Sequence, residues 1–412
     1  MNTGSMNSSW TRMHTMIFVV FSLSALIEAY IYSIAYIASS WVTVPKPFVA
    51  LLSVWPPLWL LLGAVVIGPL SDAIGRRASL YLSLSMYIIG AVGLILSSSY
   101  TLLLLFIAVL MLAVGGEYNT VMIASHEYFP STVRSRVVYE VLNFANLGGV
   151  LAALLALVNA SVFMQRLALG LTLIIIVPMM YFLRTRIPES PHWLRSRSRT
   201  MGNVDSTGAL RMTRVKMPPL WLRIIIGGLI GWSFTAGFTL LVLTLGPYYF
   251  PSLTNWLILF FSLTAFISGI IVGAIADFIS RRVMLLTSSL GTLITSLFVW
   301  LVMSIVGKPQ LLFWFLYVLF SMFVNTYWLS EDTLKSEYWV TRRRGSYTAV
   351  VRVISLGGSI PIIFLSSYLP MSSYFIAIAV VFGVGFISSL VWYLVGTETG
   401  KGISIDAWDY EQ

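Results

Sequence analysis

Twelve runs of apolar residues, each long enough to cross a bilayer, are the feature of this 412-residue chain that most constrains its fold. A helix that spans a membrane needs about 20 predominantly apolar residues. Charged residues make up 10% of the chain, whereas soluble domains average about 25%, so a water-soluble globule of this size is excluded. We therefore predict an all-α integral membrane protein with transmembrane helices at residues 16–38, 49–67, 78–96, 102–124, 137–158, 167–183, 224–245, 256–276, 283–306, 311–329, 347–365 and 374–395.

The basic residues predict how these helices are oriented. With the runs above, Lys46, Arg166 and Lys308 lie on one side of the membrane, and the other 22 of the 25 Lys and Arg residues (25 − 3) lie on the opposite side or just inside it. Lys and Arg are enriched in cytoplasmic loops, so we expect a multi-pass plasma-membrane protein with both termini in the cytoplasm. This placement also accounts for the net charge of +10 without a nucleic-acid partner.

The residue types that usually carry enzyme chemistry are scarce. The chain has no cysteine and three scattered histidines, which excludes disulfides, thiol catalysis and cysteine metal sites. Without a cluster of catalytic or metal-binding groups, we expect neither an enzyme nor a cofactor. The first apolar run is too long for the hydrophobic region of a cleaved signal peptide, so the first helix should remain in the mature protein.

Two loops of the chain carry nearly the same sequence. The loop after the second run reads GPLSDAIGRR at 68–77, and the loop after the eighth reads GAIADFISRR at 273–282. Glycine, aspartate and an arginine pair recur in the same order, 205 residues apart (277 − 72). We predict two six-helix halves, at residues 1–184 and 220–412, joined by a solvated basic cytoplasmic linker at 185–219.

A second pair of segments supports the repeat. STVR at 131–134 precedes a helix that contains Leu-Gly-Gly at 147–149, and VTRR at 340–343 precedes one that contains Leu-Gly-Gly at 356–358. The glycines are 209 residues apart (357 − 148), close to the spacing of the first pair. Parallel repeats of six helices are one of the known transporter architectures.

The repeated loops resemble the signature of the major facilitator superfamily, G-x-x-x-D-x-x-G-R-R, which follows the second helix in that family. The first copy matches it at Gly68, Asp72, Gly75, Arg76 and Arg77. The second copy has Ser280 in place of the second glycine and otherwise matches at Gly273, Asp277, Arg281 and Arg282. The resemblance implies two pseudo-symmetric six-helix bundles and a latch that holds them together on the cytoplasmic side.

The aspartates of these loops have a physical role that can be stated independently of the family. A carboxylate can accept hydrogen bonds from the exposed N–H groups at the start of another helix, where the helix dipole favours negative charge. The arginines can anchor at the interface and bridge to acids of adjacent loops, or they serve only as topology anchors. We predict a cytoplasmic gate made of both motif copies together with Glu127, Arg134, Glu189 and Arg343.

Further motifs resemble one branch of this family, the sugar porters and organic ion carriers. Residues 188–194 read PESPHWL, which departs from the branch signature P-E-S-P-R-W-L at His192 alone. EYFPSTVR at 127–134 and Gly-Gly-Glu at 115–117 are also similar to that branch. Proton-coupled relatives carry an arginine at the position of Ile107. The expected partner of a proton-binding acid is therefore missing, which leaves uniport open.

Ionisable residues inside a span are costly and usually functional. Glu28 lies near the middle of the first run, and Tyr32 and Tyr36 follow on the same helix face. Burial favours the neutral form of a carboxyl group, which suits a group that loads and unloads a proton. We predict proton coupling by Glu28, with Glu117 as a second candidate; the alternatives for Glu28 are a hydrogen bond to the solute or a satisfied buried carboxyl group.

Polar side chains at helical spacing mark two further spans. Asn143 and Asn146 lie in the fifth run, and Asn325 and Trp328 lie in the tenth. Because polar stripes avoid lipid, we predict that they face a central cavity; the alternative is that the asparagines join helices. Arg352 could bind an anionic solute or extend to the interface. Trp232 is a candidate for stacking on a sugar face.

These features predict a secondary transporter of a small polar solute, a sugar or a small organic acid. Alternating access and proton symport are the leading mechanism, with the proton gradient as the energy source. A facilitative uniporter of the same fold and a non-transporting sensor are the alternatives. We expect the protein to act as a monomer in the lipid bilayer.

Overall fold

The computed structural model describes residues 10–38, 41, 46–97, 99–158, 161–190, 194, 217–339 and 343–400, without the side chains of residues 46–50. Twelve helical segments of this part of the chain are long and apolar enough to cross a membrane, as predicted. The first six are the helices α1 (Arg12–Ile37), α2 (Lys46–Ile74), α3 (Arg76–Leu96), α4 (Tyr100–Tyr128), α5 (Arg134–Leu157) and α6 (Val162–Arg184).

The other six segments are two interrupted helices and four continuous ones. The seventh consists of α8 (Leu220–Phe238), the π-helical segment η2 (Thr239–Thr244) and α9 (Leu245–Tyr249), and the eleventh of α13 (Arg344–Arg352), η5 (Val353–Gly357) and α14 (Gly358–Ser366). The remaining segments are α10 (Thr254–Ile275) after a short 3-10 turn η3 (Pro251–Leu253), α11 (Arg281–Val306), α12 (Leu311–Glu337) and α15 (Met371–Val395).

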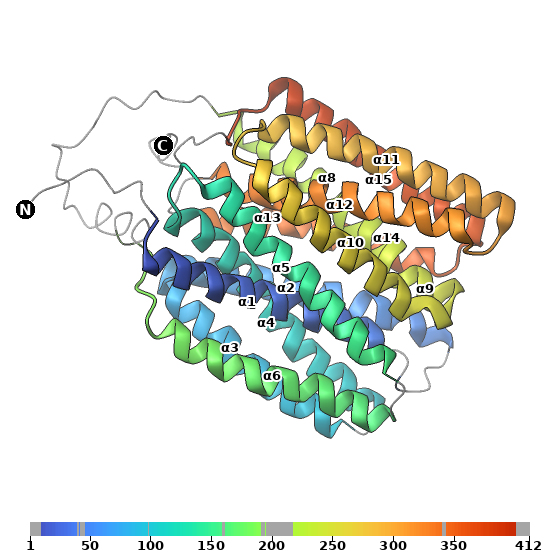
Figure 1. Cartoon of the computed structure of the whole chain (residues 1–412), viewed down its shortest axis with the longest axis horizontal. Coiled ribbons are helices and arrows are strands. Elements are labelled where there is room, and N and C mark those ends of the chain that lie inside the picture. The colour runs from blue at the N-terminus through green and yellow to red at the C-terminus, as the bar shows by residue number, and fades with distance from the viewer. Residues whose placement is uncertain are drawn as a thin grey trace, which may run out of the picture.

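The helices form two groups that follow the chain order. Figure 1 shows α1–α6, in blue to green, on one side of the molecule and α8–α15, in yellow-green to red, on the other. The groups meet where α5 packs against α10 and where α2 packs against α13 and α14. α6 ends at Arg184 and α8 begins at Leu220. Residues 191–193 and 195–216 of the predicted linker lie outside the described residues, and the division into domains stays a prediction.

Several helices run further than the apolar runs predict, and two of them do so through polar turns. α4 continues to Tyr128 and α12 to Glu337, although their last turns contain acidic residues. Glu127 and Glu337 are buried there among the other helices. Polar turns of this kind can extend a spanning helix because protein, rather than lipid, surrounds them.

The two π-helical segments are absent from the sequence prediction. η2 interrupts the regular hydrogen bonding of its helix, and the carbonyl oxygen of Leu240 accepts a hydrogen bond from the hydroxyl of Tyr374 at 2.6 Å. The Thr244 hydroxyl donates to the carbonyl oxygen of Thr239 at 3.2 Å. Side chains of the protein thus satisfy backbone groups that lipid could not.

The serine of the second motif copy is explained by backbone geometry. Gly75 precedes α3 with φ 97°, a conformation that glycine adopts without steric cost. Ser280 precedes α11 with φ −59°, which any residue adopts. The second loop therefore does not need a glycine at this position, and the Ser280 hydroxyl instead donates a hydrogen bond to the carboxylate of Glu398.

Candidate functional site

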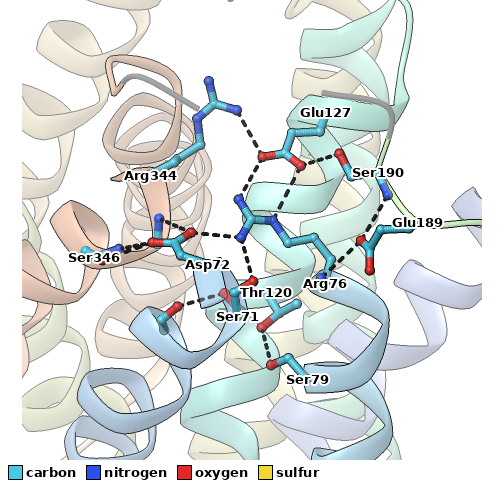
Figure 2. Close-up of polar contacts among 12 residues, drawn as sticks. Ser71, Asp72, Arg76, Ser79, Thr120, Glu127, Glu189, Ser190, Arg344 and Ser346 are labelled. Carbon is cyan, nitrogen blue, oxygen red and sulfur yellow. Dashed lines mark hydrogen bonds and ion pairs between the residues drawn. The ribbon is translucent and has the colours of Figure 1, made fainter. Parts of the chain in front are cut away.

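Asp72 joins the two helix groups at one end of the bundle, which we call the latch end. Its carboxylate accepts hydrogen bonds from the backbone N–H groups of Gly345 (3.3 Å) and Ser346 (2.9 Å) and from the Ser346 hydroxyl (2.9 Å) (Figure 2). These N–H groups belong to the first turn of α13, so the negative charge lies at the positive end of a helix dipole.

Asp277 makes the corresponding contact from the other group. Its carboxylate accepts a hydrogen bond from the backbone N–H of Arg136, in the first turn of α5, at 3.1 Å. Each aspartate of the repeated motif thus contacts the start of a helix in the opposite group. This is the contact that the sequence analysis expects of such an aspartate, and the two contacts join the two groups at the latch end.

A buried arginine organises each side of the latch end. Arg76 is fully buried, and its guanidinium binds Asp72 at 2.8 Å and Glu127 at 3.0 Å (Figure 2). Glu189 lies at the start of α3, where it accepts hydrogen bonds from the backbone N–H groups of Arg76 (3.0 Å) and Arg77 (3.2 Å). One buried carboxylate, that of Glu127, and the partly buried carboxylate of Asp72 thus share a single buried guanidinium.

The second group repeats this cluster around Arg281. Arg281 binds Glu337 at 3.0 Å and donates a hydrogen bond across the boundary to the Ser135 hydroxyl at 3.0 Å. Glu398 accepts a hydrogen bond from the backbone N–H of Arg281 at 2.9 Å. Burial tends to raise the pKa of Glu398, but the hydrogen bonds from Ser280 and from backbone N–H groups lower it.

Glu337 and Glu398 are functional candidates that the sequence analysis missed. They repeat Glu127 and Glu189 at spacings of 210 (337 − 127) and 209 (398 − 189) residues. The Leu-Gly-Gly pair is spaced by 209 residues, the same to within one residue, so the repeat itself contained the signal. Neither residue lies in a run that matches the family motif, which is why both were overlooked.

One predicted gate residue is off by one position. Arg343 is exposed, whereas the buried Arg344 reaches across the boundary to Glu127 at 3.4 Å and donates to the carbonyl oxygen of Trp339 at 3.1 Å. Arg344 and Arg134 are the first residues of α13 and α5, 210 residues apart (344 − 134). Arg134 is buried at the latch end. Arg344 is therefore the counterpart of Arg134.

The arginines that follow Arg76 and Arg281 lie nearer the surface. Arg77 is exposed and donates to the carbonyl oxygen of Thr185 at 3.2 Å. Arg282 is partly exposed and lies 3.8 Å from Glu398. Of the four motif arginines, the first of each pair therefore belongs to the buried clusters, and the second fits the role of an interfacial anchor.

Between the two helix groups lies a cavity of about 150 Å³. A single buried water needs about 10 to 15 Å³ on this measure, so the space suits a solute of several heavy atoms. Its lining is mainly apolar and aromatic. Of the residues predicted to face a central cavity or couple protons, those that line it are Glu28, Tyr32, Asn146, Asn325, Trp328 and Arg352.

Glu28 is a buried carboxyl group of the cavity lining. It is 2% exposed, and neither of its carboxyl oxygens has a hydrogen-bond partner among the described residues. The charges of Glu117, Arg184, Arg352 and Asp332 act on it. A buried carboxyl group without a partner is costly unless it carries a proton.

Glu117 has a partner that the sequence analysis did not identify. The guanidinium of Arg184, the last residue of α6, binds its carboxylate and the Ser24 hydroxyl. Arg184 is 2% exposed. Arg184 on α6 therefore supplies the positive charge that an arginine at position 107 on α4 would supply. Ile107 itself packs in the apolar core.

The three predicted asparagines connect helices across the boundary. The Asn146 amide donates to the side-chain oxygens of Asn143 (3.0 Å) and Asn325 (2.9 Å). Asn143 donates to the carbonyl oxygen of Phe266 at 3.0 Å, and Asn325 to that of Ala265 at 2.8 Å. Asn146 and Asn325 also line the cavity. Asn146 and Asn325 thus both face the cavity and join helices, whereas Asn143 only joins helices.

The aromatic candidates divide according to the helix face on which they lie. Tyr32 and Trp328 line the cavity, whereas the Tyr36 hydroxyl donates to the carbonyl oxygen of Ser53 at 3.2 Å and lies outside the lining. Trp232 also lies outside the lining and packs near Gly358. Phe234, two positions further along α8, faces the cavity and stacks on Trp328 with ring centroids 6.0 Å apart.

Part of the chain matches a known protein family. The model of the family "Sugar (and other) transporter" matches residues 48–213. Among curated proteins, the glucose transporter GlcP of Staphylococcus epidermidis is 33% identical over 142 residues, 33% of this chain and 31% of that protein. The niacin transporter NiaP of Acinetobacter baylyi is 30% identical over 141 residues, 34% and 31% of the two chains. The matches thus span about a third of these relatives.

Solved structures resemble almost the whole chain. The major facilitator superfamily proton:xylose symporter XylE bound to 6-bromo-6-deoxy-D-glucose has a TM-score of 0.76 at 14% identity, over 95% of this chain and 98% of that one. The inward-open conformation of XylE from E. coli has a TM-score of 0.69 at 16% identity, over 95% and 98%. The human organic anion transporter MFSD10 has a TM-score of 0.67 at 14% identity, over 93% and 100%. The fold and the relatives are those of transporters, not of enzymes.

Proposed function

We propose that this sugar-porter-like protein of the major facilitator superfamily carries a small organic solute, a sugar or a small organic acid, together with a proton by alternating access. The observation that carries the proposal is Glu28, a buried carboxyl group without a partner beside the central cavity. A group that binds solute-coupled protons must lie where access can alternate, and Glu28 lies between the two helix groups.

The charges of the cavity lining, together with Glu117, Glu331 and Arg184 behind it, support a proton at this place. Four carboxyl groups, those of Glu28, Glu117, Glu331 and Asp332, face the three cations Arg184, Lys335 and Arg352. One proton balances this set. The other three carboxylates are each bound to a cation, so Glu28 is the group that is left to receive the proton.

The contacts at the latch end support an alternating mechanism. Asp72 and Asp277 each contact the start of a helix in the opposite group, so both contacts must break for the cavity to open at this end. We propose that this end faces the cytoplasm, with both termini there, and that the protein acts as a monomer in the plasma membrane. The proton gradient supplies the energy, without a cofactor.

Replacing Glu28 by glutamine tests the coupling. In proteoliposomes, Glu28→Gln should lose accumulation driven by a pH gradient, because glutamine cannot exchange a proton, and should retain counterflow of the solute. Uptake and counterflow of labelled sugars and small organic acids, with and without a pH gradient, measure the two activities separately.

Glu140→Gln is the matched control, because Glu140 lies on α5 outside the cavity lining, and it should leave accumulation unchanged. Undiminished pH-driven accumulation by Glu28→Gln would contradict the assignment. Counterflow by the wild type without any response to the pH gradient would favour a uniporter, and a wild type without counterflow would favour a sensor.

A further inference from the structure

Asp332, in the last turns of α12, binds more partners than any other carboxylate of the cavity lining. Lys335 and the hydroxyl of Tyr118 contact it closely. The Trp328 indole N–H donates to it at 2.6 Å, and the Arg352 guanidinium lies 3.4 Å from it. The side chain is 1% exposed, so two cations and two neutral donors enclose one carboxylate.

The two cations around Asp332 are held at the cavity by further contacts. Lys335 also binds Glu331 at 2.8 Å. The Arg352 guanidinium donates to the Asn119 side-chain oxygen at 2.9 Å and lies over the Tyr118 ring, 4.5 Å from its centroid. Both cations line the cavity. A pair of fixed cations with neutral donors beside them is the arrangement that binds a carboxylate, and here the carboxylate belongs to the protein.

The net charge of the groups at the cavity limits which solutes the cavity can accept. When Glu28 carries a proton, the three remaining carboxylates balance the three cations around the cavity. A solute that brings a negative charge would leave that charge uncompensated in a buried site, which is strongly unfavourable. An uncharged solute leaves the balance intact.

We infer that Asp332 determines solute specificity: its carboxylate fills the anion subsite formed by Lys335 and Arg352, so that the cavity selects uncharged solutes and rejects carboxylates. This inference rests on the proposed function, of which it narrows the solute class. One interpretation of the sequence made Arg352 a ligand for an anionic solute. In the structure Asp332 already neutralises this arginine.

Direct binding to the purified protein tests this assignment without requiring transport. Nicotinate and nicotinamide share a ring and differ by one negative charge at neutral pH, and calorimetry in detergent gives the affinity of each. The wild type should bind nicotinate more weakly than nicotinamide. Asp332→Asn, which keeps the shape and removes the charge, should bind nicotinate about tenfold or more tightly than the wild type does, with little change for nicotinamide.

Glu331→Gln is the matched control, because it also removes one carboxylate from Lys335 but leaves Asp332 in the subsite; it should gain much less affinity for nicotinate. An equal gain in both variants would overturn the assignment, as would a folded Asp332→Asn variant without any gain. If Asp332→Asn does not fold, Asp332→Ser is tested in its place.

Tight nicotinate binding by the wild type would overturn the inference whatever the variants do. Failure of the proposed function has a different signature, because a protein that transports no solute can still show the predicted difference in binding.

Discussion

Replacing Arg76 by methionine should lower the stability of the protein by about 3 to 5 kcal/mol, which is the typical cost of removing one partner from a buried ion pair. Methionine is of similar length but leaves Asp72 and Glu127 without the guanidinium that binds both of them (Figure 2). Glu127 is buried, so water cannot replace the lost contact. The midpoint of thermal unfolding in detergent, compared with that of the wild type, measures the loss.

Arg77→Met is the control for this experiment. Arg77 is the neighbouring arginine of the motif but is exposed, and exposed charge contacts contribute about 0 to 1 kcal/mol. The two variants remove the same side chain, one from a buried cluster and one from the surface. Equal shifts of the unfolding midpoint would show that Arg76 acts only as an interfacial anchor, which would contradict the role given to the buried clusters.

Replacing both latch aspartates should open the latch end. Each aspartate accepts backbone hydrogen bonds from a helix of the opposite group, and hydrogen bonds to charged groups contribute about 1.5 to 3 kcal/mol each. Asp72→Asn combined with Asp277→Asn keeps the side-chain shapes and removes both charges. We expect the ratio of open to closed latch to rise by more than about tenfold, since about 1.4 kcal/mol corresponds to that factor.

The absence of cysteine from the chain makes this shift directly measurable. Cysteines introduced at Thr185 and Phe278, which are exposed at the latch end in the two groups, can be spin-labelled without background. Electron paramagnetic resonance should then show longer distances in the double variant than in the parent. Asp277→Asn alone should give an intermediate population, and an unchanged distance distribution in the double variant would rule out the latch.

Most of the fold follows from the sequence because it depends on local composition and on the repeat. Apolar runs predict the twelve spanning segments, and the doubled loop predicts that Asp72 and Asp277 act alike. The π-helical segments η2 and η5 were not predictable in this way, since their runs are as apolar as those of regular helices. They depend on contacts such as that of Tyr374 with Leu240, which only the folded chain supplies.

The candidate site was less predictable, because its contacts join distant parts of the chain. Arg184 looks like the first residue of a basic linker, yet it pairs with Glu117, 67 residues earlier. Trp232 and Phe234 differ by two positions, and two positions on a helix decide which of them faces the cavity. Arg343 and Arg344 are adjacent, and the repeat spacings of 209 and 210 residues do not distinguish them. Only the folded chain shows that Arg344 is the buried one that reaches Glu127.

Proton movement driven by the solute tests the central proposal most directly. Proteoliposomes that contain a pH-sensitive dye, without an imposed pH gradient, receive a solute that the protein exchanges in counterflow. The account predicts that the solute carries protons with it and changes the internal pH in the wild type, whereas Glu28→Gln exchanges the solute without any pH change. Solute uptake by the wild type with no accompanying proton movement would contradict it.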